Sequence, residues 1–144
     1  MKTFSKIFLA VALIATIGFF AMAERNVPVK SIPSAAQTFI NKHYSDAKVY
    51  NCEKEGSEYD VDLSNGVDIK FNKKGKLIRI ESDRGAISKS VLDAILPANA
   101  VEHLVSLDLI DQVDEVEFRR NSIVVELQNY DDYEIRFDLN GFIK

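Results

Sequence analysis

The stretch "VDIKFNKKGKLIRI", Val67 to Ile80, decides the fold, because its pattern returns near the other end of the chain as "YEIRFDLNGFIK", Tyr133 to Lys144. In both stretches apolar and charged residues alternate, a polar turn closes on glycine, and an apolar segment follows. Alternation with a period of two is typical of a strand with one buried and one solvated face. Each stretch therefore predicts two antiparallel strands joined by a loop in which Gly75 or Gly141 is left-handed.

The two halves of the chain align well beyond these stretches, at an offset of 64 residues. The matches include Pro33 with Pro97, Ala36 with Ala100, Ile40 with Leu104, Val61 with Val125, and Leu63 with Leu127. Two extra residues in the second half then change the offset to 66, which pairs Phe71 with Phe137 and Gly75 with Gly141. The matched residues are apolar residues, prolines and glycines, so they indicate two copies of one structural unit that share a core.

Each copy is predicted to be a helix followed by four antiparallel strands. After Pro33, the residues Ala36, Phe39 and Ile40 follow at helical spacing, and the period then drops to two, with Asn65-Gly66 supplying the positive φ angles of a tight hairpin. A short helix over residues 88–95 leads into the second copy, whose last strand is clipped at Lys144. The predicted class is α+β, with one antiparallel sheet of about seven or eight strands and helices packed on one face.

The first 23 residues have the features of a secretory signal peptide. Lys2 and Lys6 precede an apolar run over residues 7–20, and "AMA" at 21–23 supplies small residues for cleavage. The alternative is a membrane anchor, but this run is shorter than the ~20 residues that a spanning helix needs. We therefore expect a domain over residues 24–144, with repeats at about 27–81 and 88–144, that is secreted to the periplasm without a stable membrane anchor.

Charge and cysteine content exclude some classes of function. The chain has 22 acidic and 18 basic residues, for a formal net charge of −4, and no basic stripe that would bind nucleic acid. Cys52 is the only cysteine, so an internal disulfide is impossible. Free cysteines are among the most buried residues, and we expect Cys52 to pack as a small apolar group.

The line "IPSAAQTFINKHYSDAKVYNCEKEGSEYDVDLSNGVDIKFNKKGKLIRI", Ile32 to Ile80, resembles the PepSY-like family of periplasmic proteins, whose fold is related to that of the secreted β-lactamase inhibitor protein. The proline-led helix, the Asn65-Gly66 turn and the closing Gly75 carry the resemblance. Ser45, Leu77 and His103 depart from the family pattern. The resemblance implies a periplasmic, non-enzymatic module that binds or inhibits a protein or peptide partner, and it supplies no catalytic residue.

The search for catalytic groups supports the same interpretation. His43 and His103 lie on different predicted helices, and neither has a histidine or cysteine at metal-ligand spacing. The chain contains no G-x-S-x-G motif of a serine nucleophile. A secreted enzyme with an unrecognised site remains the competing class.

Acidic residues near two turns make calcium a candidate ligand. Asp60 and Asp62 precede the Asn65-Gly66 turn, and Asp131 and Asp132 lie in the longer loop of the second copy. Carboxylate oxygens are the ligands that calcium prefers, although the spacing does not match an EF-hand. The alternative is that these aspartates form the solvated face of a strand pair.

Four aromatic residues are candidates for contact with a partner: Tyr130, Tyr133, Phe142 and Tyr50. Tyrosine is enriched in interface cores because it offers large contact area and a hydroxyl at little entropic cost. Tyr130 and Tyr133 both flank the Asp131-Asp132 loop, and Tyr130 is the strongest candidate. For Tyr50 and Tyr133, packing in the core is an equal alternative.

Overall fold

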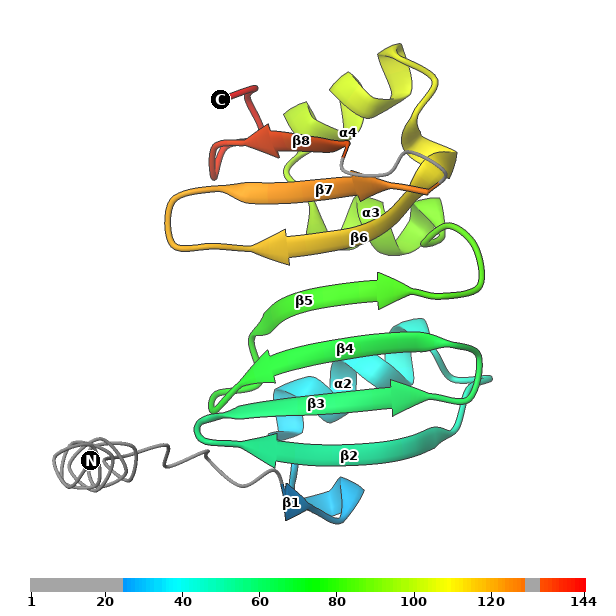
Figure 1. The fold of residues 1–144 in the computed structure, drawn as a ribbon, viewed down its shortest axis with the longest axis vertical. Helices are drawn as coiled ribbons and strands as arrows, with labels where there is room; N and C mark the ends of the chain where they lie inside the picture. Colours follow the sequence, from blue (N-terminus) through cyan, green and yellow to red (C-terminus); the bar gives the residue numbers. More distant parts are fainter. Residues whose placement is uncertain (1–24, 129–132) are drawn as a thin grey trace, which may run out of the picture.

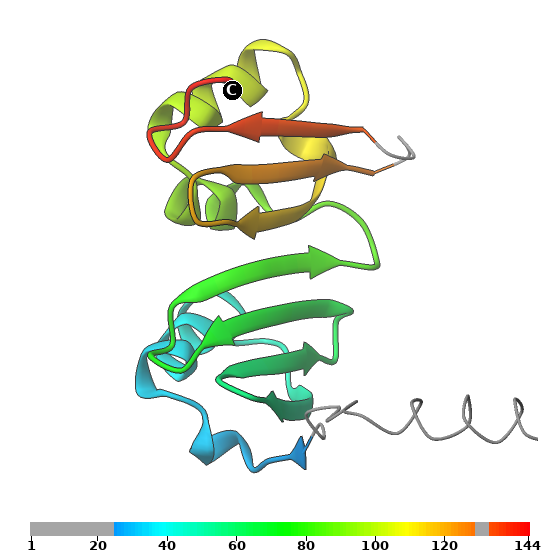
Figure 2. The ribbon, with the colours of Figure 1, turned by 60° about the vertical axis from the view of Figure 1, so that its left-hand side comes forward.

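A computed structural model of the chain shows one antiparallel sheet of eight strands, with the helices on one face of the sheet (Figures 1 and 2). The strands lie side by side in chain order, from β1 at one edge to β8 at the other. The structure describes residues 25–128 and 133–144. The predicted signal peptide, residues 1–23, lies outside the described residues, and so do Tyr130, Asp131 and Asp132.

The first copy is a helix followed by four strands, as the sequence predicts. Its elements are β1 (Arg25–Asn26), the 3₁₀ helix η1 (Val29–Ser31), α2 (Ser34–His43), β2 (Val49–Glu55), β3 (Glu58–Leu63), β4 (Val67–Asn72) and β5 (Leu77–Ser82). Helix α2 begins directly after Pro33, whose ring fixes φ at a value suited to a helix start. It ends where the backbone N–H of Tyr44 donates to the carbonyl of Ile40.

The second copy repeats this order with a shorter last segment. Its elements are α3 (Lys89–Ile95), α4 (Ala98–Ser106), the 3₁₀ helix η2 (Ile110–Gln112), β6 (Val113–Phe118), β7 (Ile123–Leu127) and β8 (Glu134–Phe137). The fourth strand is reduced to an isolated bridge between Phe137 and Ile143. The sequence predicts that Phe142 lies in a final strand. In the structure Phe142 lies instead directly before the bridge residue Ile143, outside any strand. The tandem duplication is confirmed.

One core lies between the helices and the inner face of the sheet. A single row of inward residues crosses the sheet at consecutive partner positions from β2 to β8: Cys52, Val61, Ile69, Ile80, Val116, Val125 and Ile135. All seven are buried. The two longer helices add Ala36, Ile40, Ala100 and Leu104. Cys52 is 4% exposed, which confirms its predicted place in the core.

A glycine in each copy fixes a hairpin loop against the start of that copy's helix. Gly75 has φ +80° and Gly141 has φ +87°, as predicted. A side chain at Gly75 would lie 2.9 Å from the backbone nitrogen of Ala36, and one at Gly141 would lie 2.6 Å from that of Ala100. Because only glycine combines a positive φ with so close an approach, these two positions hold the same contact in both copies.

The Asn65-Gly66 turn differs from its prediction. Gly66 alone has a positive φ, +82°, so the prediction of a positive φ at Asn65 is wrong. The N–H of Gly66 donates to the carbonyl of Leu63 at 3.0 Å, and the Asn65 side chain accepts a bond from the N–H of Val67 at 3.3 Å. The loop therefore has three residues and closes on a left-handed glycine, an arrangement that needs only one positive φ.

Strands β5 and β6 join the two copies. Three pairs make this seam: Arg79 with Glu117, Ile80 with Val116, and Glu81 with Glu115. The middle pair points into the core and is fully buried. Successive side chains of a strand point to opposite faces, so the two flanking pairs point to the outer face, away from the core. Charged side chains therefore meet across the seam on that face.

Candidate functional site on the outer face of the sheet

The face of the sheet opposite the helices carries a line of carboxylates. Six acidic residues occupy consecutive partner positions across β3 to β8: Asp62, Asp68, Glu81, Glu115, Glu126 and Glu134. We call these six residues the acidic row. Side chains at directly opposed positions lie about 5 Å apart at Cβ, so neighbouring members of the row repel one another. Figure 2 shows that the described helices leave this face uncovered.

Cations in the neighbouring row offset part of this charge. Arg79 forms ion pairs with Glu81 (3.2 Å) and Glu115 (3.8 Å), and Arg136 forms one with Glu134 (2.6 Å). Lys70 pairs instead with Asp60 (3.5 Å) and Glu58 (3.8 Å), which lie outside the acidic row. Most of these side chains are partly exposed, and each such pair stabilises the fold by less than about 1 kcal/mol. Arg79 differs because it contacts two members of the acidic row at the seam.

Glu115 has the most perturbed carboxyl group in the acidic row. Burial first, and then Glu126 and other nearby carboxylates, together raise its pKa to about 7, while Arg79 acts in the opposite direction. Burial and neighbouring acidic groups also raise the pKa values of Glu126 and Asp68. The outer face thus holds carboxylates that are less ready to ionise than carboxylates in water.

The described aromatic residues among the predicted contacts lie in two distant parts of the sheet. Tyr50 occupies a bulge in β2 and is 83% exposed. Tyr133 precedes β8 and Phe142 follows it, with 53% and 58% of their surfaces exposed. Tyr130 lies outside the described residues. Because five strands lie between β2 and β8 in the sheet, Tyr50 does not share one patch with Tyr133 and Phe142.

The predicted calcium ligands Asp60 and Asp62 lie on the outer face of β3. Asp60 forms the ion pair with Lys70, and the carboxylate of Asp62 accepts a hydrogen bond from the side-chain amide of Asn51 at 3.2 Å. Asp131 and Asp132 fall in the connection between β7 and β8, outside the described residues. Strands β3 and β7 are four positions apart in the sheet, so about 19 Å separates these two strands at ~4.8 Å per strand.

Both histidines lie on the helices and contact aromatic rings of the core. The ring of His43 lies 4.7 Å from that of Phe39, and the ring of His103 lies 5.8 Å from that of Phe137. Within residues 25–128 and 133–144, no group of three or more histidine, cysteine or acidic residues is arranged to hold a metal ion. The histidines therefore have a place at the boundary between helix and core.

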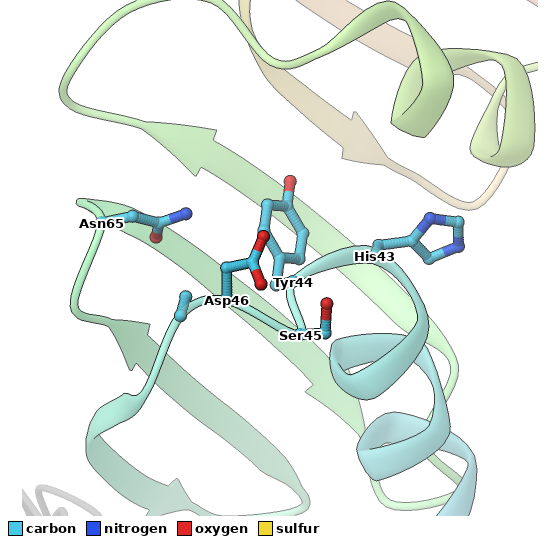
Figure 3. Close-up of a pocket in the computed structure, with 6 residues that line it drawn as sticks. His43, Tyr44, Ser45, Asp46 and Asn65 are labelled. Carbon is cyan, nitrogen blue, oxygen red and sulfur yellow. The ribbon is translucent and has the colours of Figure 1, made fainter.

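A polar hollow that the sequence did not indicate lies at the end of α2 (Figure 3). Its volume is 200 Å³, and it extends from His43 to Ala47 and to Asn65 in the β3–β4 turn. In Figure 3, Asp46 lies between Tyr44 and Asn65, while His43 points away from them. Burial raises the pKa of Tyr44 to about 12, so its hydroxyl stays protonated. The histidine and the carboxylate do not converge, so the hollow lacks the arrangement of a general base and nucleophile.

Comparison with known proteins identifies the fold. None of the described helices has the length and apolar character needed to cross a membrane. No curated protein matches the chain. Solved structures do match it. One is described as a putative calcium-regulated periplasmic protein from Bacteroides thetaiotaomicron; it is 26% identical, with a TM-score of 0.71, over 84% of this chain and 94% of the other.

Two structures from Bacteroides vulgatus have the same fold. One is described as a putative periplasmic protein and is 28% identical, with a TM-score of 0.72, over 86% of this chain and 96% of the other. The second, a putative periplasmic protein of unknown function, is 22% identical with a TM-score of 0.71 over 85% and 97%. The family described as "Putative beta-lactamase-inhibitor-like, PepSY-like" matches residues 19–79 and 85–144. The chain belongs to this PepSY-like family.

Proposed function

We propose that the protein is a non-enzymatic periplasmic module that binds, and by binding inhibits, a protein or peptide partner on the outer face of its sheet and the adjoining loops. The observation that carries this proposal is the acidic row on an uncovered sheet face. The family's inhibitor-like description supports it, and the periplasmic structural relatives support the compartment.

The charge of the outer face defines the kind of partner. Six carboxylates extend across β3 to β8, and their ion pairs with Arg79 and Arg136 offset only part of their charge. A partner with lysine or arginine side chains would relieve the repulsion within the row. Complementary charge speeds association and excludes acidic partners. The partner surface is therefore basic where it meets the sheet.

Charge reversal in the acidic row should abolish most of this binding. We expect the double variant Asp68→Lys and Glu126→Lys to bind the partner at least about tenfold more weakly, a loss of about 1.4 kcal/mol. Both carboxylates are repelled by acidic neighbours, so lysine at these positions should not unfold the protein. The measurement is capture of the partner from a periplasmic extract, followed by titration of the purified pair.

The matched control carries the same change in charge away from the outer face. Glu102 on α4 and Asp111 in η2 are exposed, and the variant Glu102→Lys with Asp111→Lys should bind as the unmodified protein does. Equal losses in both double variants would contradict the proposal. The same titration tests whether the loops contact the partner, with single alanine substitutions at the four candidate aromatic residues Tyr130, Tyr50, Tyr133 and Phe142.

A second candidate function is a response to calcium, which one structural relative favours through its description as calcium-regulated. In this chain the candidate ligands are Asp60, Asp62, Asp131 and Asp132. Repulsion within the acidic row would also weaken when a divalent cation binds beside it. Extracellular modules commonly bind calcium with dissociation constants of about 10⁻⁴ to 10⁻³ M.

Calcium should raise the melting temperature by a few degrees. At ten times the dissociation constant the folded state gains about 1.4 kcal/mol. Magnesium should have a smaller effect, because it releases its water reluctantly and requires stricter octahedral geometry. The measurement is a thermal melt in chelator and in calcium. A rise that sodium chloride of matched ionic strength reproduces would mean general screening and would contradict a calcium site.

A further inference from the structure

A second surface lies at one end of the sheet, where the two copies meet. In Figure 1 the β4–β5 and β6–β7 connections and the loop after β8 lie together at the left of the view. Residues of these three segments and of the adjoining ends of β4, β5 and β6 line a hollow of 280 Å³. We call this hollow the seam groove. Its volume is close to the lower end of the ~300 to 1,000 Å³ range of ligand pockets, so it suits one or two side chains.

The seam groove has an apolar lining. Leu77, Ile78, Phe118 and Leu139 contribute to it. The first three are partly buried, and Leu139 is 55% exposed. Phe118 and Leu77 also pack against the core, which holds this part of the lining in place. Apolar surface that stays in contact with water favours the binding of an apolar side chain.

All the charged residues that line the seam groove are cations. Lys76 enters from the β4–β5 connection, and Arg119 and Arg120 enter from the β6–β7 connection. Arg119 forms an ion pair with Glu117 at 2.6 Å. Within the described parts of the chain, the side chains of Lys76 and Arg120 form no hydrogen bond or ion pair. Two cations of the groove therefore remain available for a ligand.

Other cations increase the positive potential at this end. Lys73 and Lys74 are exposed in the same β4–β5 connection. Lys144 donates from its Nζ to the backbone carbonyl of Asn121, beside Arg120, at 3.1 Å. The net charge of the whole chain is −4, so this concentration of positive charge is local. Such a patch attracts carboxylates, and arginine binds them with two parallel hydrogen bonds.

We propose that the seam groove binds a short peptide segment in which an apolar side chain is flanked by aspartate or glutamate. The apolar side chain enters the space between Leu77, Phe118 and Leu139, and the flanking carboxylates pair with Lys76 and Arg120. The segment belongs to a partner protein. This surface is separate from the acidic row and takes a ligand of opposite charge, so the proposal does not rest on the sheet-face function.

Fluorescence polarisation with a labelled peptide tests the groove directly. The probe is the hexapeptide Glu-Asp-Leu-Phe-Asp-Glu with blocked ends. We expect saturable binding that the double variant Lys76→Glu with Arg120→Glu weakens at least about tenfold. The control variant Lys30→Glu with Lys42→Glu makes the same charge change at exposed lysines of η1 and α2, and it should bind as the unmodified protein does.

Further probes separate the apolar and electrostatic parts of the interaction. Glu-Asp-Gly-Ser-Asp-Glu keeps the charge and lacks the apolar side chains, and it should bind at least about tenfold more weakly. Equal affinity for both acidic peptides would overturn the proposal, as would equal losses in the two double variants or no saturable binding. Vesicles of phosphatidylethanolamine and phosphatidylglycerol serve as the membrane probe. Binding to these vesicles, but not to the peptide, would assign the groove to a lipid surface and overturn the proposal.

Discussion

The substitution Gly141→Ala should destabilise the protein by about 3 kcal/mol and lower its melting temperature by about 12 °C. Two costs add. A left-handed backbone costs a residue with a Cβ about 1–2 kcal/mol, and Gly141 has φ +87°. The new Cβ would also lie 2.6 Å from the backbone nitrogen of Ala100. Backbone at a helix start cannot move aside as a flexible side chain can, so the loop or α4 must shift, which costs a further 1–3 kcal/mol or so.

Two other glycines separate these costs. Gly85 has a φ of +116°, and a Cβ at this position would have no atom within 4 Å. The substitution Gly85→Ala should therefore cost only the backbone strain, a loss of about 1–2 kcal/mol in the free energy of unfolding. Gly75→Ala has a closest approach of 2.9 Å, to the backbone nitrogen of Ala36, and should fall between the two. Urea unfolding of the three variants gives the order. A loss at Gly85 as large as that at Gly141 would mean that the contact with the helix start is not the cause.

The same glycine contact explains why the fold could be predicted from the sequence. Pro33 and Gly75 are far apart in the chain, yet their counterparts Pro97 and Gly141 repeat with nearly the same separation. Both pairs meet in space, with a side chain at either glycine lying 3.0 Å from the proline Cβ. A repeat preserves the residues that close such a contact, so helix, strands and hairpin loops could all be recognised from the spacing.

The acidic row could not be recognised in this way. Its six members come from six strands, and each appears in the sequence as an ordinary solvated position beside a buried one. Their proximity depends on the register between strands, above all on the pairing of Glu81 with Glu115 across the seam. Irregularities between β4 and β5 and between β6 and β7 shift that register by a residue. Periodicity within one strand indicates which face a residue occupies, but not which residue lies opposite.

The exposure of Tyr50 shows a similar limit. The bulge between Val49 and Asn51 interrupts the alternation of β2, so the sequence left core packing and solvent exposure equally open. In the structure the side chain is 83% exposed. A bulge redirects a side chain through a local change of backbone geometry, which a pattern of apolar and polar residues does not encode.

The substitution Glu115→Gln should stabilise the protein by about 2 kcal/mol above neutral pH. The folded-state pKa of Glu115, about 7, is raised above its ordinary value of 4.5 by burial first and then by Glu126, Glu81 and Glu117, with Arg79 opposing. A raised pKa means that the fold favours the protonated carboxyl group. The unmodified protein therefore loses stability as the pH rises between about 4.5 and 7, and the glutamine variant, which cannot ionise, does not. The Glu115 side chain is 16% exposed. Because water screens part of its interactions, the expected stabilisation is smaller than the full free energy that the pKa shift represents.

Urea unfolding at several pH values measures this effect. At about pH 4 the two proteins should unfold with nearly equal free energies, because Glu115 is then protonated in both the folded and the unfolded state. At about pH 8 the variant should be more stable by the full amount, and its stability should fall less steeply between those values. Glu102→Gln, on the exposed surface of α4, is the matched control and should follow the unmodified protein throughout. A Glu115→Gln variant that is less stable at about pH 8 would mean that the attraction to Arg79, 3.8 Å away, outweighs burial and repulsion at the seam.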